Sequence, residues 1–346
     1  MSASESAGLA RSRNSGHEGS RTIALTGART FLGKNLLKLL EEDARVRRIV
    51  VIDADPPERA GVKTRSYPVD RTQPNASARI AEILASEAVD AFVHLGFLEN
   101  PVRSAAWAHE YESVGTLNVL NACREQRVKK LVLGSSTSLY GPHLDNPHFL
   151  REAAPLRGVF GAPFFADKID AERQVEAFAR EQTSACVTVL RFAPLLGPTV
   201  ESYLTRWLSR RLVPTLLGYD PLLQFVHEVD AIFALKHALD GDVPGVFNIV
   251  GDGVLPASKV IKLMGRNSLP LPYFLARRLT ALLWLAGASE VPSQMLRFLR
   301  HLCVADGDKA RRELGFLPSY TTREAVLAFG AALRLREARL LTEAYV

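Results

Sequence analysis

Strand-like apolar segments alternate with amphipathic segments along residues 22–196 of the 346-residue chain. The apolar segments are Thr22–Gly27, Arg48–Asp55, Val89–Gly96, Lys129–Ser136 and Ala185–Pro194. The helical segments between them are Phe31–Asp43, Arg79–Ala88, Gly115–Gln126 and Asp167–Gln182. Strands that are apolar on both faces are typical of a parallel sheet covered by helices on both sides. We therefore expect an α/β fold with a doubly wound parallel Rossmann sheet.

The alternation breaks after Gly197-Pro198, where Arg206–Leu217 and Ala257–Leu314 are expected to be mostly helical. Strand and helix patterns return between these two segments, so the second region is discontinuous in sequence. The predicted division is a disordered tail over 1–20, an NAD(P)-binding domain over 21–196 continued by about 224–253, and a smaller, mostly helical substrate lobe over 197–223 and 254–346.

Composition excludes several classes of function. The net charge of +6 comes without a dense basic cluster, so we expect no nucleic-acid partner. Three cysteines lie far apart and the histidines show no paired ligand spacing, which favours a cytoplasmic protein without a disulfide framework or a metal. Arg277 and Arg278 interrupt the most apolar run, Leu269–Ala288, so we expect no integral membrane segment.

A glycine-containing turn stands between the first expected strand and the first expected helix. Its sequence is TGARTFLG, Thr26–Gly33. A tight turn needs Gly27 and close helix packing needs Gly33, while the helix N-terminus offers free N–H groups to a pyrophosphate. Asp53 follows at about twenty residues, where a carboxylate binds the adenosine ribose hydroxyls and repels a 2′-phosphate. The pattern favours NAD over NADP, and the alternative is that Asp53 is only a turn residue.

Further motifs follow in a recognisable order. They are PVD (Pro68–Asp70), VHLG (Val93–Gly96), VGTLNVLNAC (Val114–Cys123), GSSTSLYG (Gly134–Gly141), LRFAPLLGP (Leu190–Pro198), FVHEVD (Phe225–Asp230) and GVFNIVGDG (Gly245–Gly253). With TGARTFLG, which resembles TGxxGxxG, they resemble the extended, atypical short-chain dehydrogenase/reductases of the NAD-dependent epimerase/dehydratase family. The family patterns for three of these segments are NVxGTxNVLEA, SSxxVYG and LRxxNVYGP. The resemblance covers about Thr22 to Arg323.

The resemblance implies a set of cofactor-binding residues. They are Gly27, Thr30, Phe31, Leu32, Gly33, Asp53, Asp70, Leu95, Gly96 and Lys168. Asp70 matches the acid that contacts adenine, and Leu95 and Gly96 belong to the segment beneath the nicotinamide half. Thr30 replaces the middle glycine of the turn, where a side chain crowds the pyrophosphate.

The active-site pair of the family is altered. In the pattern Tyr-x-x-x-Lys, the lysine holds the nicotinamide ribose and the tyrosine exchanges a proton with substrate, but here Phe164 precedes Lys168. A phenyl ring cannot transfer a proton. Three routes stay open: Ser136 relays a proton through Lys168 and a water, Tyr140 reaches in from the neighbouring loop, or the substrate needs no strong acid.

The implied function is an NAD(H)-dependent oxidoreductase or epimerase/dehydratase-like enzyme. Pro194 and Leu223-Gln224 stand where sugar-nucleotide members of the family carry an Asn and an Arg for the diphosphate. We therefore expect a small, apolar hydroxy or keto substrate. The alternatives are a non-catalytic NAD(P)-binding regulator or scaffold, and an enzyme resting on a membrane surface. The resemblance also implies a homodimer.

Overall fold

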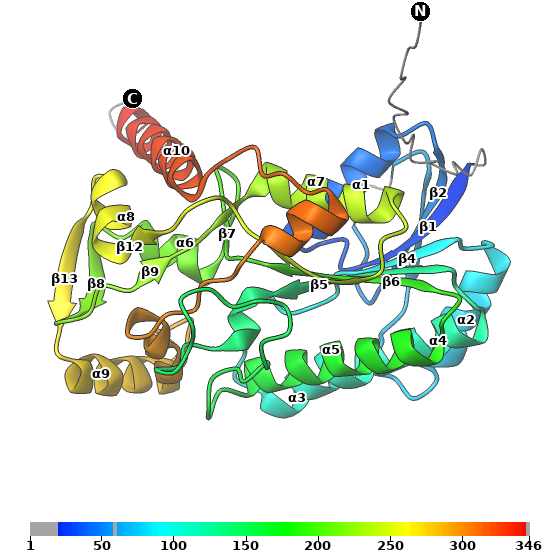
Figure 1. The fold of residues 1–346 in the computed structure, drawn as a ribbon, viewed down its shortest axis with the longest axis horizontal. Helices are drawn as coiled ribbons and strands as arrows, with labels where there is room; N and C mark the ends of the chain where they lie inside the picture. The colour runs from blue at the N-terminus through cyan, green and yellow to red at the C-terminus, as the bar shows by residue number, and fades with distance from the viewer. Residues whose placement is uncertain (1–19, 58–60, 344–346) are drawn as a thin grey trace, which may run out of the picture.

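Seven parallel strands form one central sheet in the computed structural model, which describes residues 20–57 and 61–343 (Figure 1). The strand order is β11-β6-β5-β4-β1-β2-β3. The strands are β1 (Arg21–Thr26), β2 (Val46–Asp53), β3 (Thr64–Pro68), β4 (Ala91–His94), β5 (Lys130–Ser136), β6 (Cys186–Phe192) and β11 (Gly245–Ile249). This order reverses beside β1, as in a doubly wound Rossmann sheet, so the expected fold class is confirmed.

Helices cover both faces of the sheet. On one face lie α1 (Phe31–Glu42) and α7 (Glu228–Asp240), and on the other lie α2 (Ala76–Ser86), α4 (Gly115–Glu125) and α5 (Pro163–Glu181) (Figure 1). Alternate residues of β1 enter different cores, because Ile23 and Leu25 pack with α1 and α7 whereas Ala24 packs with α2 and α4. Burial on both sides explains why the strands are apolar without alternation.

The helix α3 (Ala105–His109) and the π turn Glu110–Val114 precede α4, and the π turn Ala310–Leu314 packs on β11 in the core of the sheet. A smaller lobe contains the helices α6 (Tyr203–Leu208), α8 (Ala257–Leu263), α9 (Tyr273–Leu285) and α10 (Thr322–Glu343), with a 3₁₀ turn at Ser293–Leu299. Three strand pairs complete it: β7 (Leu195–Leu196) with β10 (Val226–His227), β9 (Leu222–Leu223) with β12 (Leu255–Pro256), and β8 (Leu212–Leu216) with β13 (Asn267–Leu271). The helical character expected for this C-terminal part is confirmed.

The structure differs from the sequence expectation at three strands: β3, β8 and β13, which lies inside the segment Ala257–Leu314 that was expected to be mostly helical. Arg206–Leu217 was expected to be helical, but the chain turns after Leu208 and β8 pairs with β13, burying Val213 and Leu216. Five residues are too few to separate strand from helix by periodicity. The edge strand β3 was not expected, since it is half exposed and just as short. The predicted tail lies, except for Ser20, outside the described residues.

Among the described residues, no helix combines the length and the hydropathy that a membrane span requires.

Candidate cofactor and active site

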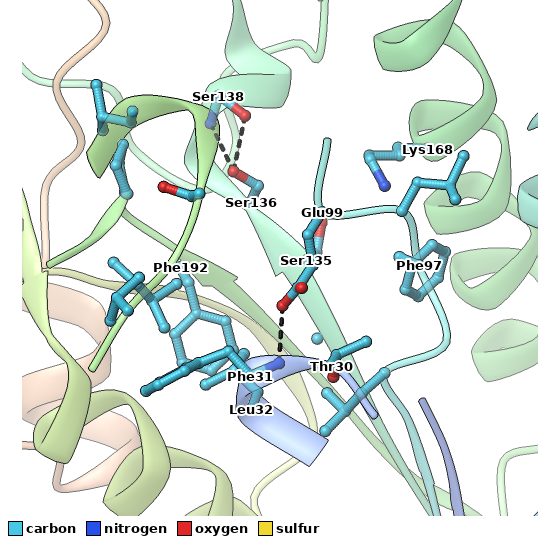
Figure 2. A pocket seen from close by; sticks show the side chains of 18 of the residues that line it. Thr30, Phe31, Leu32, Phe97, Glu99, Ser135, Ser136, Ser138, Lys168 and Phe192 are labelled. Carbon is cyan, nitrogen blue, oxygen red and sulfur yellow. Dashed lines mark hydrogen bonds between the residues drawn. The ribbon is translucent and has the colours of Figure 1, made fainter. Parts of the chain in front are cut away.

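A cavity of about 210 Å³ opens where the carboxyl ends of β1, β4, β5 and β6 meet (Figure 2). Ligands of open parallel sheets bind at this edge. The lining residues are Thr30–Leu32, Leu95, Phe97–Glu99, Leu133–Ser136, Ser138, Phe164, Lys168, Phe192–Leu195 and Val200–Leu204. The cavity therefore joins the glycine turn, the altered active-site helix and the start of the lobe.

The turn after β1 is packed so tightly that two positions require glycine. Gly27 has φ +77°, and a Cβ there would lie 2.3 Å from the backbone carbonyl of Leu95. A Cβ on Gly33 would lie 1.9 Å from the carbonyl oxygen of Gly27. Both distances are far below van der Waals contact. Gly27 allows the turn to pack against the end of β4, and Gly33 allows the first turn of α1 to pack against the backbone of Gly27.

The side-chain hydroxyl of Thr30 forms hydrogen bonds with the backbone of the glycine turn and of α1. Its hydroxyl accepts a hydrogen bond from the N–H of Gly33 at 3.1 Å and donates one to the carbonyl oxygen of Gly27 at 2.7 Å. Thr30 is thus the N-cap of α1. It satisfies one helix N–H itself, which leaves fewer N–H groups for a bound anion.

A carboxylate of the protein stands at the N-terminus of α1. Glu99, in the loop after β4, accepts a hydrogen bond from the N–H of Phe31 at 2.8 Å (Figure 2). Helix N-termini favour negative charge through their free N–H groups and their dipole. The geometry therefore places an internal anion where the sequence pattern expects a pyrophosphate.

Asp53 connects the turn to the end of β2. Its carboxylate accepts hydrogen bonds from the N–H groups of Gly27 and Ala28, both at 2.8 Å, and the residue is 8% exposed. Burial raises the pKa of this carboxyl, although the two N–H donors and the nearby charge of Arg71 act in the opposite direction. Each oxygen keeps a lone pair, so a second acceptor role stays available.

Asp70 lies apart from the cavity. It is exposed, and its carboxylate accepts from the N–H of Thr72 and the amide of Gln73, both at 3.0 Å. These bonds lower the pKa of its carboxyl. In the structure the Asp70 carboxylate stabilises a local turn. Its contact with adenine stays a prediction.

Arg71, the next residue, was not anticipated and is buried at 3% exposure. Its Nη2 donates to the carbonyl oxygen of Gly96 at 2.6 Å, and its guanidinium lies 4.6 Å from the ring of Tyr111. Among the described residues, its Nη1 has no hydrogen-bond partner. A buried cation with a spare donor beside Gly96 is suited to an anionic or polar ligand.

Lys168 is held in a buried ion pair. Its Nζ lies 2.7 Å from Oε1 of Glu112, which also accepts from the N–H of Leu98 at 2.8 Å. The exposed fractions of the two side chains are 12% and 1%. The rings of Phe164 and Phe97 flank the ammonium at 4.7 and 5.2 Å. Burial raises the pKa of Glu112, although Lys168 acts in the opposite direction.

The two hydroxyl candidates separate in the structure. Ser136 lines the cavity with Lys168 and shares a hydrogen bond with the hydroxyl of Ser138 at 2.7 Å (Figure 2). Tyr140 is fully buried, donates to Asn248 and accepts from Arg191, both at 2.8 Å. Its ring faces the core and not the cavity, which corrects the idea that it reaches in from the loop.

Both the sequence and the fold resemble those of known proteins. Residues 23–250 match the model of the NAD dependent epimerase/dehydratase family. The chain belongs to this family. An uncharacterized protein of Mycobacterium tuberculosis is 31% identical over 308 residues, covering 88% of this chain and 82% of the relative.

Solved epimerases and dehydratases share the fold. A UDP-glucose 4-epimerase of Thermotoga maritima with UDP-glucose has a TM-score of 0.68 and 20% identity, covering 91% of this chain and 99% of its own. A dTDP-glucose 4,6-dehydratase of Bacillus anthracis in complex with NAD has a TM-score of 0.69 and 16% identity, covering 92% of this chain and 98% of its own.

Against the family pattern NVxGTxNVLEA, this epimerase/dehydratase-family chain has Glu112 at the asparagine position. This departure from the family pattern could have identified Glu112 as a candidate site residue. No sequence signal pointed to Glu99 or Arg71. Glu99 lies in the loop after β4 and Arg71 follows β3, so their positions depend on the tertiary fold. Among the described residues, no cluster of three or more His, Cys, Asp or Glu side chains forms a metal site.

Proposed function

We propose that the protein is an NAD(H)-dependent oxidoreductase or epimerase/dehydratase-like enzyme that acts on a small, apolar hydroxy or keto substrate. The observation that carries the proposal is one cavity that holds the glycine turn, Lys168 and Ser136 together. Apolar pockets with a few convergent polar groups are the usual form of a small-molecule site.

The residues present fit a nicotinamide dinucleotide. The hydrogen bond from the N–H of Phe31 to Glu99 supports an anion-binding role for the start of α1, which a pyrophosphate takes when Glu99 moves away. Asp53 at the end of β2 supports NAD over NADP, since a second negative charge there is repelled. The Bacillus anthracis dehydratase, whose structure contains NAD, has the same fold.

Lys168 and Ser136 are the groups that handle the substrate oxygen. The cofactor supplies or takes the hydride when it is bound. In the reductive direction, the Lys168 ammonium gives a proton to the carbonyl oxygen, while Ser136 donates a hydrogen bond to that oxygen. The buried carboxylate of Glu112 pairs with the lysine ammonium and holds it in place. In the oxidative direction, the neutral lysine takes the proton back.

The cavity wall supports an apolar substrate. Leu195, Val200 and Leu204 line it on the lobe side, and Pro194 offers no donor to a diphosphate. Gln224 is occupied, because its amide bonds the N–H and the carbonyl oxygen of Ala305. A nucleotide sugar is the second candidate, favoured by the UDP-glucose bound to the Thermotoga maritima epimerase.

A substrate panel tests the proposal. The protein is incubated with NADH and apolar ketones, with NAD and apolar secondary alcohols, and with UDP-glucose and dTDP-glucose. Nicotinamide absorbance follows oxidation and reduction, and NMR follows any change in the sugars. Turnover of a ketone or alcohol supports the proposal, turnover of the sugars alone favours the second candidate, and NAD(H) binding without turnover favours a regulator.

Glu99→Gln is expected to tighten NADH binding roughly tenfold, because a pyrophosphate no longer competes with a carboxylate at α1. Fluorescence titration measures the dissociation constant. Glu110→Gln, an exposed change outside the cavity, is the matched control. If Glu99→Gln weakens NADH binding, Glu99 contributes to the cofactor site instead of competing for it.

A further inference from the structure

Helix α9 turns an apolar half toward solvent. Most of its side chains lie away from the protein, and within the helix only Ala276 is buried. At about 100° per residue, the outward half holds Phe274, Leu275, Leu279, Leu282, Leu283 and Leu285, and Arg278 lies among them. Phe274, Leu282 and Leu285 are 65%, 64% and 81% exposed. Large clustered apolar side chains on a surface mark an interaction site.

The apolar surface extends beyond the helix. β13 leads directly into α9 at one end of the lobe, and β8 lies beside it (Figure 1). Leu269 of β13 is 41% exposed, and Leu217, which follows β8, is 59% exposed. The N–H of Leu217 donates to the carbonyl oxygen of Leu271 at 2.9 Å, which holds this loop against the start of α9. Exposed leucines therefore lie on β13 and next to β8 as well as on α9.

The charge of this end of the lobe is positive. Residues 267–289 contain Arg277 and Arg278 and no Asp or Glu. Arg103 adds a third cation at the other end of the helix, where its guanidinium lies 5.2 Å from the ring of Trp284 and its Nε donates to the carbonyl oxygen of Trp284 at 3.2 Å. An apolar face with arginines and without acids is complementary to anionic lipid headgroups above hydrocarbon.

We propose that α9 docks the protein on the surface of an anionic lipid bilayer. The 13-residue helix is too short to span the hydrocarbon, so it lies in the interfacial layer. The apolar side chains of its outward half are immersed, and Arg278 extends its guanidinium to the headgroups. A second copy of the chain fits the charge less well, because a two-fold interface on α9 brings the arginines of the two copies together without acids from this segment.

The docking helix is connected to the cavity through one turn and one apolar cluster. α9 packs on the turn Ser293–Leu299, whose Met295 and Phe298 form one apolar cluster with Phe164 and Tyr203. Phe164 and Tyr203 line the cavity. If the proposed function holds, an apolar substrate dissolved in the bilayer has a short path to the site, but the docking itself does not depend on that function.

Vesicle co-sedimentation tests the docking without any substrate. The full chain is mixed with phosphatidylcholine vesicles that contain or lack phosphatidylglycerol, at low and high salt. We expect binding to the anionic vesicles that salt weakens. Leu282→Glu with Leu285→Glu is expected to weaken it tenfold or more, and Arg277→Gln with Arg278→Gln roughly 30-fold. Leu317→Glu, at a site 66% exposed on a different segment, is the matched control and is expected to bind normally.

Two outcomes overturn the docking proposal. One is that the unaltered protein fails to sediment with anionic vesicles at low salt. The other is that light scattering finds a dimer that Leu282→Glu with Leu285→Glu dissociates, because α9 is then covered by a second copy. Circular dichroism of each variant verifies the fold, and NADH titration of the same samples reports separately on the proposed function.

Discussion

Phe164→Tyr is expected to raise the rate of the chemical step by roughly two to four orders of magnitude. Phe164 lies one helical turn before Lys168, its ring is 4.7 Å from the lysine Nζ, and it lines the cavity. A phenol at this position restores a group that exchanges a proton with the substrate oxygen. Single-turnover oxidation of NADH by the ketone found in the panel measures the rate, and UDP-glucose provides a reference for the family chemistry.

The control for this prediction is Phe160→Tyr. Phe160 lies in the loop just before α5 and is 88% exposed, so its hydroxyl enters water and is expected to change nothing. A lower activity of Phe164→Tyr would contradict this prediction. The proton transfer would then depend on the phenyl ring beside Lys168, and a hydroxyl there would disturb it.

Glu112→Leu is expected to lower the free energy of unfolding by about 3 kcal/mol. The change removes the carboxylate that faces the Lys168 ammonium and also leaves the N–H of Leu98 without its acceptor. Urea unfolding followed by circular dichroism measures the effect. Glu110→Leu is the matched control, because Glu110 is an exposed acid in the same π-helical turn, Glu110–Val114, and this change is expected to alter stability little.

A double-mutant cycle identifies the cause. If the loss comes from a buried unpaired ammonium, Glu112→Leu with Lys168→Met recovers much of the stability, because two apolar side chains replace the pair. Additive losses in the double variant contradict the buried ion pair as the source of the effect.

The fold could be predicted from the sequence because its signals are local. Continuous apolar strands, amphipathic helices and the glycine turn each depend on neighbouring residues. β3 and β8 could not be predicted, since five residues give no reliable period. The helical expectation for Arg206–Leu217 failed there for that reason.

The site was predictable only where a motif fixes the backbone. The positions of Gly27, Gly33 and Lys168 follow from a turn and a helix that begin at defined residues. The direction of a side chain that follows a strand depends on tertiary packing, which the local sequence does not reveal. For this reason Tyr140 was expected at the cavity, whereas it packs against Arg191 and Asn248. Glu99 and Glu112 come from a loop and a π-helical turn that the pattern of apolar residues does not reveal.

The most direct test of the central claim is a fluorescence titration of the purified protein with NADH and with NADPH. We expect that NADH binds, that NADPH binds more weakly because of Asp53, and that Glu99→Gln tightens the binding of NADH. If neither dinucleotide binds to the unaltered protein or to Glu99→Gln, the glycine turn does not serve a dinucleotide, and the cavity does not belong to an NAD-dependent enzyme.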